Sequence, residues 1–131
     1  MSESEIVLDA SALLALLLDE PGGSKVAEVI ALSKISVVNY AEVVSHFAKL
    51  GMPAGEIDDM LDPLPMTIVP ADKDLGQIAG RLRAVTLEAG LSLGDRFCLA
   101  QAIRDGLPAW TADKAWRNIA GAAKADVVVI R

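Results

Sequence analysis

Four acidic residues have the types and positions in this sequence that could do chemistry: Asp9, Glu42, Asp95 and Asp113. Each stands where a strand-like apolar run gives way to a helix start, or within the first turn of the following helix. In an open parallel α/β sheet these junctions meet at one edge, so we expect the four side chains to converge. Carboxylates gathered there repel each other unless cations neutralise them, and oxygen-rich clusters suit Mg²⁺ or Mn²⁺. The pattern therefore predicts a metal-dependent phosphodiesterase site.

Each acid taken alone also has a simpler explanation as a helix cap. The segments 39–42 (Asn-Tyr-Ala-Glu) and 92–95 (Ser-Leu-Gly-Asp) both match a capping box, and an acid in a first turn is favoured by the helix dipole. Asp9 is different, because a carboxylate that ends a buried strand needs a partner. Capping places acids at any helix start, whereas a site requires them at the ends of neighbouring strands. The sequence meets the second condition if the first and fourth strands are adjacent.

The elements that must position these acids alternate between strand and helix. Apolar runs predict strands at 5–9, 35–38, 66–69, 107–111 and 126–130. Capping and stop residues predict helices capped by Ser11, Ser24, Asn39, Asp72 and Ser92, and shorter helices at 54–61 and 113–120. This alternation predicts an α/β fold, a three-layer α/β/α sandwich with a five-stranded parallel sheet in the order 3-2-1-4-5. We expect residues 1–131 to form a single domain.

The hydrophobic content and the net charge of the chain indicate which partners it could bind. The chain has 131 residues, of which 53% are hydrophobic, and its mean hydropathy is +0.41. Such an apolar excess predicts that some surface faces another subunit, and hence a homodimer. A net charge of −6 argues against a broad basic face for nucleic acid and suits a basic protein partner. It does not exclude a nuclease, since four of the eighteen acids belong to the predicted site.

The single cysteine and the short hydrophobic runs indicate where in the cell the protein is expected. Cys98 is the single cysteine, which excludes an internal disulfide and a multi-thiolate metal site, as expected in a reducing cytosol. Met1 to Glu5 does not resemble a signal peptide, and the apolar run 10–18 falls far short of the ~20 residues that span a bilayer. We therefore expect a soluble, cytoplasmic protein with no membrane partner.

Four segments of the chain resemble the four motifs of PIN-domain nucleases, and more narrowly those of VapC-type toxins from prokaryotic toxin–antitoxin pairs. These are VLDASAL at 7–13, NYAEV at 39–43, LSLGDRFCLA at 91–100 and TADKAW at 111–116. They occur in order and at family-like spacing over essentially the whole chain, which gives them together a specificity that no single motif has.

The resemblance implies a role for each matching residue. The acids Asp9, Glu42, Asp95 and Asp113 fall on the family's Mg²⁺- or Mn²⁺-binding positions, for one or two ions. Ser11 and Thr111 fall where the family often supports that cluster. The implied fold is a five-stranded parallel α/β/α sandwich, the implied activity is endoribonucleolytic cleavage of RNA, and the implied partner is a VapB-like antitoxin. One departure is Ala115, where some members carry another acid, which leaves a second metal less securely held.

Residues beside the acids are candidates for RNA contact. Arg96, Lys114 and Arg117 could bind RNA phosphates, although solvated helix surface with local ion pairs is the alternative for each. Hydrolysis by metal-activated water needs no histidine, and the single histidine, His46, is expected to be a packing or surface residue. Trp110 and Trp116 could stack on bases, but core packing is the expected role for both.

Two further readings from other functional classes stay open. One is a receiver-like phosphoacceptor domain, which normally needs paired acids after the first strand and an acceptor after the third. The chain offers Val69-Pro70-Ala71-Asp72 at the third strand and no acidic pair near Asp9. The other is a PIN-like binding module without catalysis, for which the presence of all four acids gives no support.

Overall fold

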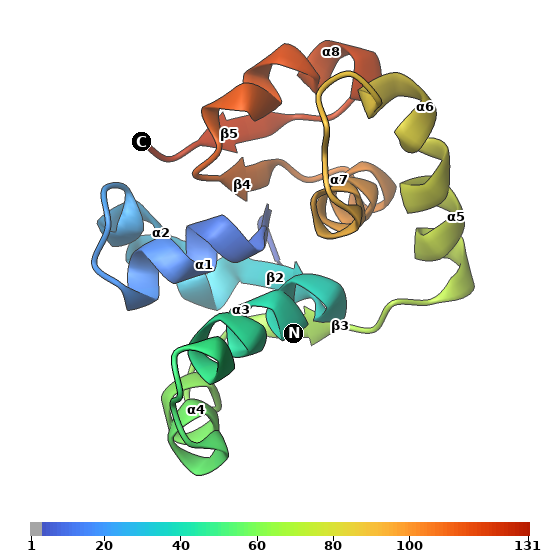
Figure 1. Cartoon of the computed structure of the whole chain (residues 1–131). Helices are drawn as coiled ribbons and strands as arrows, with labels where there is room; N and C mark the ends of the chain where they lie inside the picture. Colours follow the sequence, from blue (N-terminus) through green and yellow to red (C-terminus); the bar gives the residue numbers. More distant parts are fainter. Residues whose placement is uncertain (1–3) are drawn as a thin grey trace.

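The computed structural model describes residues 4–131, and its centre is a five-stranded sheet (Figure 1). Every pair of neighbouring strands is parallel, and the strand order is β3-β2-β1-β4-β5. The strands are β1 Ile6–Leu8, β2 Ser33–Ser36, β3 Thr67–Val69, β4 Ala109–Thr111 and β5 Val127–Val129. The predicted fold class and strand order are confirmed. The first and fourth strands are adjacent, with Leu8 paired to Trp110. This adjacency is the condition that the predicted site needed.

The central strand β1 is buried on both faces. Val7 and Leu8 are fully buried and Ile6 is 6% exposed. Their side chains alternate, so that Val7 packs into one core cluster while Ile6 and Leu8 pack into another on the opposite face. A short, wholly apolar strand is what a parallel sheet covered by helices on both sides demands.

The two faces are covered by different halves of the chain (Figure 1). Leu13, Ile35, Val43 and Phe47 form the core under the first group of helices. That group comprises α1 Ala10–Leu17, α2 Gly23–Val29, the 3₁₀ helix η1 Ile30–Leu32, α3 Val37–Lys49 and α4 Ala54–Leu61. The opposite face carries α5 Lys73–Arg81, α6 Arg83–Thr86, α7 Leu93–Asp105, the 3₁₀ helix η2 Lys114–Asn118 and α8 Ala120–Ala123. Cys98 and Trp116 are fully buried there, which confirms the core role expected of Trp116.

Three predicted helix starts are wrong. Ser24 lies inside α2, whose N-cap is Gly22. The other two corrections concern the site. Helix α1 begins one residue after Asp9, whose carboxylate accepts the Ala12 N–H, so that Asp9 and not Ser11 is the cap. Helix α3 begins at Val37, and Ser36 caps it by accepting the Val38 N–H at 3.2 Å. Val37 and Val38 have the β-branched character of a strand, but the Ser36 cap turns the chain before them. Asn39 is therefore inside the helix, and Glu42 lies beyond its first turn.

The long helix expected after Asp72 is also interrupted. Asp72 caps α5 as predicted, but the helix ends at Arg81 and a separate turn, α6, follows. Val85 is 48% exposed, so it does not continue the buried stripe. Similarly, the segment predicted as a helix at 113–120 is the 3₁₀ helix η2 followed by the short α8. The predicted helix from Ser92 to Gly106 is confirmed, with a capping box at its start and a left-handed Gly106 at its end.

Within residues 4–131, no helix has both the length and the apolar character needed to cross a membrane.

The close packing of α1 against α2 depends on Gly23, and this generates a stability prediction. A Cβ at Gly23 would meet the backbone carbonyl of Ala15, which cannot move without disturbing α1. We expect Gly23→Ala to lower the free energy of unfolding by about 1–3 kcal/mol through overpacking. The matched control is Gly76→Ala inside α5, where a Cβ meets nothing within 4 Å and the change should stabilise by about 0.5–1 kcal/mol. Urea denaturation measures both, and equal effects of the two substitutions would contradict the packing account.

Candidate active site

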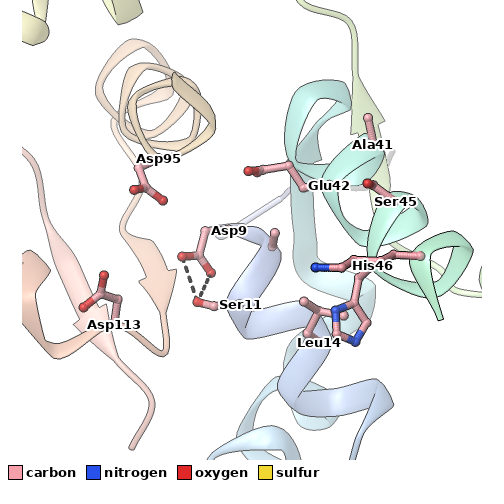
Figure 2. Close-up of a pocket in the computed structure, with 11 residues that line it drawn as sticks. Asp9, Ser11, Leu14, Ala41, Glu42, Ser45, His46, Asp95 and Asp113 are labelled. Atoms are coloured by element: carbon pink, nitrogen blue, oxygen red, sulfur yellow. Dashed lines mark hydrogen bonds between the residues drawn. The ribbon is translucent and has the colours of Figure 1, made fainter. Parts of the chain in front are cut away.

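The four predicted acids line one pocket of about 670 Å³ at the carboxyl edge of the sheet (Figure 2). Asp9 lies between β1 and α1, Glu42 is on α3, Asp95 is in the first turn of α7, and Asp113 follows β4. Figure 2 shows the Glu42 side chain extending from α3 toward the space beside Asp9 and Asp95. The pocket is lined by Asp9, Ala10, Ser11, Leu14, Ala41, Glu42, Ser45, His46, Lys49, Asp95 and Asp113. The expected convergence is thus present in the structure.

Asp9 is the most buried of these acids, and hydroxyl groups hold its carboxylate in place. The Ser11 hydroxyl donates to Oδ1 at 2.7 Å and lies 2.9 Å from Oδ2, while the Thr111 hydroxyl donates to Oδ2 at 2.6 Å. The Ala12 N–H donates to Oδ1 at 2.8 Å. Asp9 is only 3% exposed, and in the described part of the chain no lysine or arginine forms an ion pair with it. Its negative charge is therefore stabilised by dipoles alone.

The same two hydroxyls tie Asp9 to the chain after β4. The Ser11 hydroxyl accepts the Ala112 N–H at 2.9 Å, and the Thr111 hydroxyl accepts the Asp113 N–H at 3.0 Å. This network joins the acid at the end of β1 to the backbone that positions Asp113. The two hydroxyl residues expected to accompany the acids are thus placed in direct contact with one of them.

Burial has a measurable electrostatic consequence for Asp9. Desolvation of the charged form raises its pKa from 3.8 to about 6. The hydrogen bonds from Thr111, Ala12 and Ser11 act in the opposite direction and lower the pKa, while the nearby Asp95 charge raises it. Near neutral pH the pocket therefore contains a carboxylate that is ionised at a free-energy cost.

The capping explanation holds for Asp95 and Asp113, but it does not exclude the site explanation. Asp95 Oδ2 accepts the Ser92 N–H at 2.9 Å in the predicted capping box. Asp113 caps η2 by accepting the Ala115 N–H through Oδ1 at 2.9 Å. Each cap uses one carboxylate oxygen, so both acids can cap a helix and still present an oxygen to the pocket.

The wall formed by α3 contains residues that the sequence analysis missed or set aside. Ser45, His46 and Lys49 line the pocket three, four and seven residues after Glu42, a spacing that places all of them on one face of the helix. That spacing was readable in the sequence. The His46 ring also packs edge-on against Phe47, with the ring centroids 5.1 Å apart, so the residue combines packing with a place on the pocket wall.

The three candidates for RNA contact are placed differently from one another. Arg96 is 7% exposed and its guanidinium Nη1 donates to the Ala79 carbonyl at 3.1 Å. This placement contradicts an RNA contact through Arg96, because the helix turn that brings Asp95 to the pocket directs its neighbour into the core. Lys114 and Arg117 are exposed on η2, outside the pocket lining. Among the described residues that line the pocket, Lys49 is the one lysine or arginine.

The donor set of this pocket fits a hard divalent cation. Carboxylate and hydroxyl oxygens are the groups that Mg²⁺ and Mn²⁺ prefer, and no lysine or arginine among the described residues pairs with Asp9. Within residues 4–131, no three His, Cys, Asp or Glu side chains are grouped closely enough to enclose an ion as they stand. Mg²⁺ usually keeps several waters and binds through one or two carboxylates, so this spacing suits a partly hydrated ion.

The family model described as the PIN domain matches residues 6–122, from the first residue of β1 into α8. The chain belongs to the PIN-domain family. No curated protein matches it significantly by sequence.

Solved structures similar to this PIN domain show the same fold at low sequence identity. A toxin–antitoxin complex from Klebsiella pneumoniae is 22% identical with a TM-score of 0.73, covering 97% of this chain and 98% of the other. VapBC2 from Rickettsia felis, bound to a DNA fragment from its promoter, is 16% identical with a TM-score of 0.74, covering 96% and 98%. VapBC-5 from Mycobacterium tuberculosis is 22% identical with a TM-score of 0.60, covering 99% and 100%.

The raised pKa of Asp9 predicts how the stability of this PIN domain depends on pH. Between about pH 4 and pH 6 the folded protein binds the Asp9 proton more tightly than the unfolded chain does, so this group's contribution to stability falls as pH rises. Asp9→Asn removes the ionisable group. We expect the variant to be more stable than the wild type at pH 7.5 in EDTA, by up to about 3 kcal/mol, with a smaller difference at pH 4.

Thermal denaturation of both proteins across this pH range measures the effect. A stability difference between wild type and variant that stays the same from pH 4 to pH 7.5 would contradict the assignment of a raised pKa to Asp9.

Proposed function

We propose that this PIN domain is a divalent-metal-dependent endoribonuclease and the toxin of a VapBC-type toxin–antitoxin pair. The observation that carries the proposal is the pocket in which Asp9, Glu42, Asp95 and Asp113 arrive from four separate elements. Helix capping alone does not explain why Glu42 faces the other three acids, because Glu42 lies beyond the first turn of α3. Similarity in fold to complexes described as VapBC or toxin–antitoxin supports the biological part of the proposal.

The four carboxylates would hold Mg²⁺ or Mn²⁺, as one or two ions. When bound, such an ion lowers the pKa of a water and stabilises charge on phosphate oxygens. Asp9 supplies a preorganised carboxylate, because Ser11 and Thr111 fix both of its oxygens. Lys49 on the pocket wall, together with the exposed Lys114 and Arg117, would contact RNA phosphates. With one histidine in the sequence, the protein cannot use a pair of histidines as acid and base.

The receiver-like alternative finds no support in the structure. Its phosphoacceptor would be Asp72, which follows β3 at the edge of the sheet, two strands away from β1. Asp72 instead caps α5 by accepting the Leu75 N–H and pairs with Arg104 at 3.3 Å. The other alternative, an inactive PIN-like module, differs from the proposal in metal binding, so titration of the protein with Mn²⁺ separates the two.

The nuclease proposal predicts a selective effect of removing a pocket charge. Asp113→Asn keeps an oxygen that can cap η2 but removes one negative charge from the pocket. We expect RNA cleavage in Mg²⁺ or Mn²⁺ to fall at least about a hundredfold, since electrostatic groups at a reaction centre have effects of that size. Cleavage of a fluorescent RNA oligonucleotide measures the rate, with circular dichroism confirming the fold.

The matched control is Asp126→Asn, an exposed acid just before β5 and outside the pocket, which should cleave at the wild-type rate. In the same assay Lys49→Gln should raise KM more than it lowers kcat, because Lys49 would bind substrate without touching the reacting atoms. Wild-type cleavage by Asp113→Asn would contradict the proposed site.

The partners are also part of the proposal. Exposed apolar side chains, including Leu50 at 69% and Leu87 at 62%, together with the net charge of −6, support a homodimer that binds a basic VapB-like antitoxin. Sedimentation analysis of the purified protein should give twice the monomer mass. Coexpression with the product of an adjacent short reading frame should give a complex that weakens as salt is raised. A monomer that ignores that product would contradict both parts.

A further inference from the structure

Asn39 is a buried polar residue that has no role in the nuclease function proposed above. It lies on α3 one turn before Glu42 and is 1% exposed. Its side-chain Nδ2 donates to Glu42 Oε1 at 2.8 Å and to the Gly94 carbonyl at 2.9 Å. Both hydrogens of the amide are therefore used, one on a predicted metal-binding acid of α3 and one on the backbone of α7.

The acceptor half of the same amide is left without a partner. Asn39 Oδ1 is buried and has no hydrogen-bond partner in the described part of the chain. Such an orphaned acceptor is destabilising, and an asparagine inside a helix is a poor helix former. The helix start cannot justify it, because Ser36 caps α3. The presence of an asparagine at this position is therefore best explained by the two hydrogen bonds that its amide N–H groups donate.

Gly94 provides the second side of the same arrangement. A Cβ built on Gly94 would lie 2.5 Å from Glu42 Cδ and Oε2, closer than real Cβ contacts come. The Glu42 carboxylate therefore rests against the bare backbone of the first turn of α7, in space that a side chain would fill. Gly94 immediately precedes Asp95, so the contact joins the Glu42 carboxylate to the backbone next to a second acid of the pocket.

We propose that Asn39 is a positioning residue that locks the Glu42 carboxylate and the start of α7 together, and so sets the spacing of Glu42 and Asp95 before a cation binds. We call Asn39, Glu42 and Gly94 the α3–α7 latch. Its consequence for metal binding rests on the proposed function, whereas the latch itself does not. Without the two donors, the exposed Glu42 side chain is free to rotate away from α7, and binding an ion must then include the entropy of fixing it.

The first test measures Mn²⁺ affinity by titration calorimetry in four proteins: wild type, Asn39→Leu, Glu42→Gln and the double variant. Asn39→Leu removes both donors but keeps a side chain that fills the core. We expect it to weaken Mn²⁺ binding about tenfold to a hundredfold, the usual effect of removing a group that orients a metal ligand, without lowering the melting temperature. In the Glu42→Gln background the same change should have little further effect on affinity, because Asn39 acts through Glu42.

Glycine variants provide a matched pair for the other side of the latch. Gly94→Ala should weaken Mn²⁺ binding, since the new Cβ displaces the Glu42 carboxylate, whereas Gly80→Ala on α5, with nothing within 4 Å of its Cβ, should not. Wild-type affinity in both Asn39→Leu and Gly94→Ala would overturn the positioning role. A loss of affinity that is equally large with and without Glu42 would overturn it as well.

A metal-free measurement separates failure of the latch from failure of the proposed function. In ¹⁵N-edited NMR spectra, the Asn39 side-chain NH₂ signals should be protected from exchange and should shift when Glu42 is replaced by Gln. Wild-type protein that binds no Mn²⁺ but shows this response would contradict the proposed function and leave the latch confirmed. Asn39 NH₂ signals that exchange freely and ignore Glu42→Gln would overturn the latch itself.

Discussion

The structure depends on one electrostatic constraint, the burial of the Asp9 carboxylate at the end of the central strand. The group is nearly inaccessible, and two hydroxyls and a backbone N–H hold it where a basic side chain would be expected. Burial raises its pKa to about 6, so ionisation near neutral pH costs free energy. Within residues 4–131 the fold keeps this carboxylate without pairing it to a lysine or arginine, so the site is suited to a cation from outside the chain.

The topology of the sheet explains why the other acids arrive at the same place. Because β1 and β4 are neighbours, the chain that leaves β4 lies beside the end of β1. Hydrogen bonds of the Ser11 and Thr111 hydroxyls connect the two segments there. Helices α3 and α7 start from the same edge and lie on opposite faces, and they bring Glu42 and Asp95 to either side of Asp9. This is the switch point of a doubly wound sheet, where ligands bind in open α/β folds.

Much of the fold could be predicted from the sequence, and so could the presence of these four acids in one pocket, because apolar runs and the acids near their ends are local patterns. Apolar runs separated by turn residues predict where the strands lie, and their alternation with helices predicts a parallel sheet. Strands β1 and β4 end where two of those runs end. The helix starts near the site were less predictable. Val37 and Val38 have strand propensity, yet the hydroxyl of Ser36 begins a helix there, and Asp9 rather than Ser11 caps α1. In each case a side-chain oxygen that accepts a backbone N–H sets the first residue of the helix.

Contacts between distant residues were beyond sequence reasoning. The burial of Arg96 depends on the position of the Ala79 carbonyl on a different helix, and the donors of Asn39 depend on Gly94, which is 55 residues away. Lys49 is the opposite case, since its helical spacing from Glu42 was readable but drew no attention without the pocket.

The central claim is that these acids share a divalent cation, and anomalous X-ray scattering from crystals soaked in Mn²⁺ tests it most directly. The account predicts an anomalous peak in the pocket, in contact with Asp9 and at least one of Glu42, Asp95 and Asp113. A well-ordered pocket that contains no peak at saturating Mn²⁺ would contradict it.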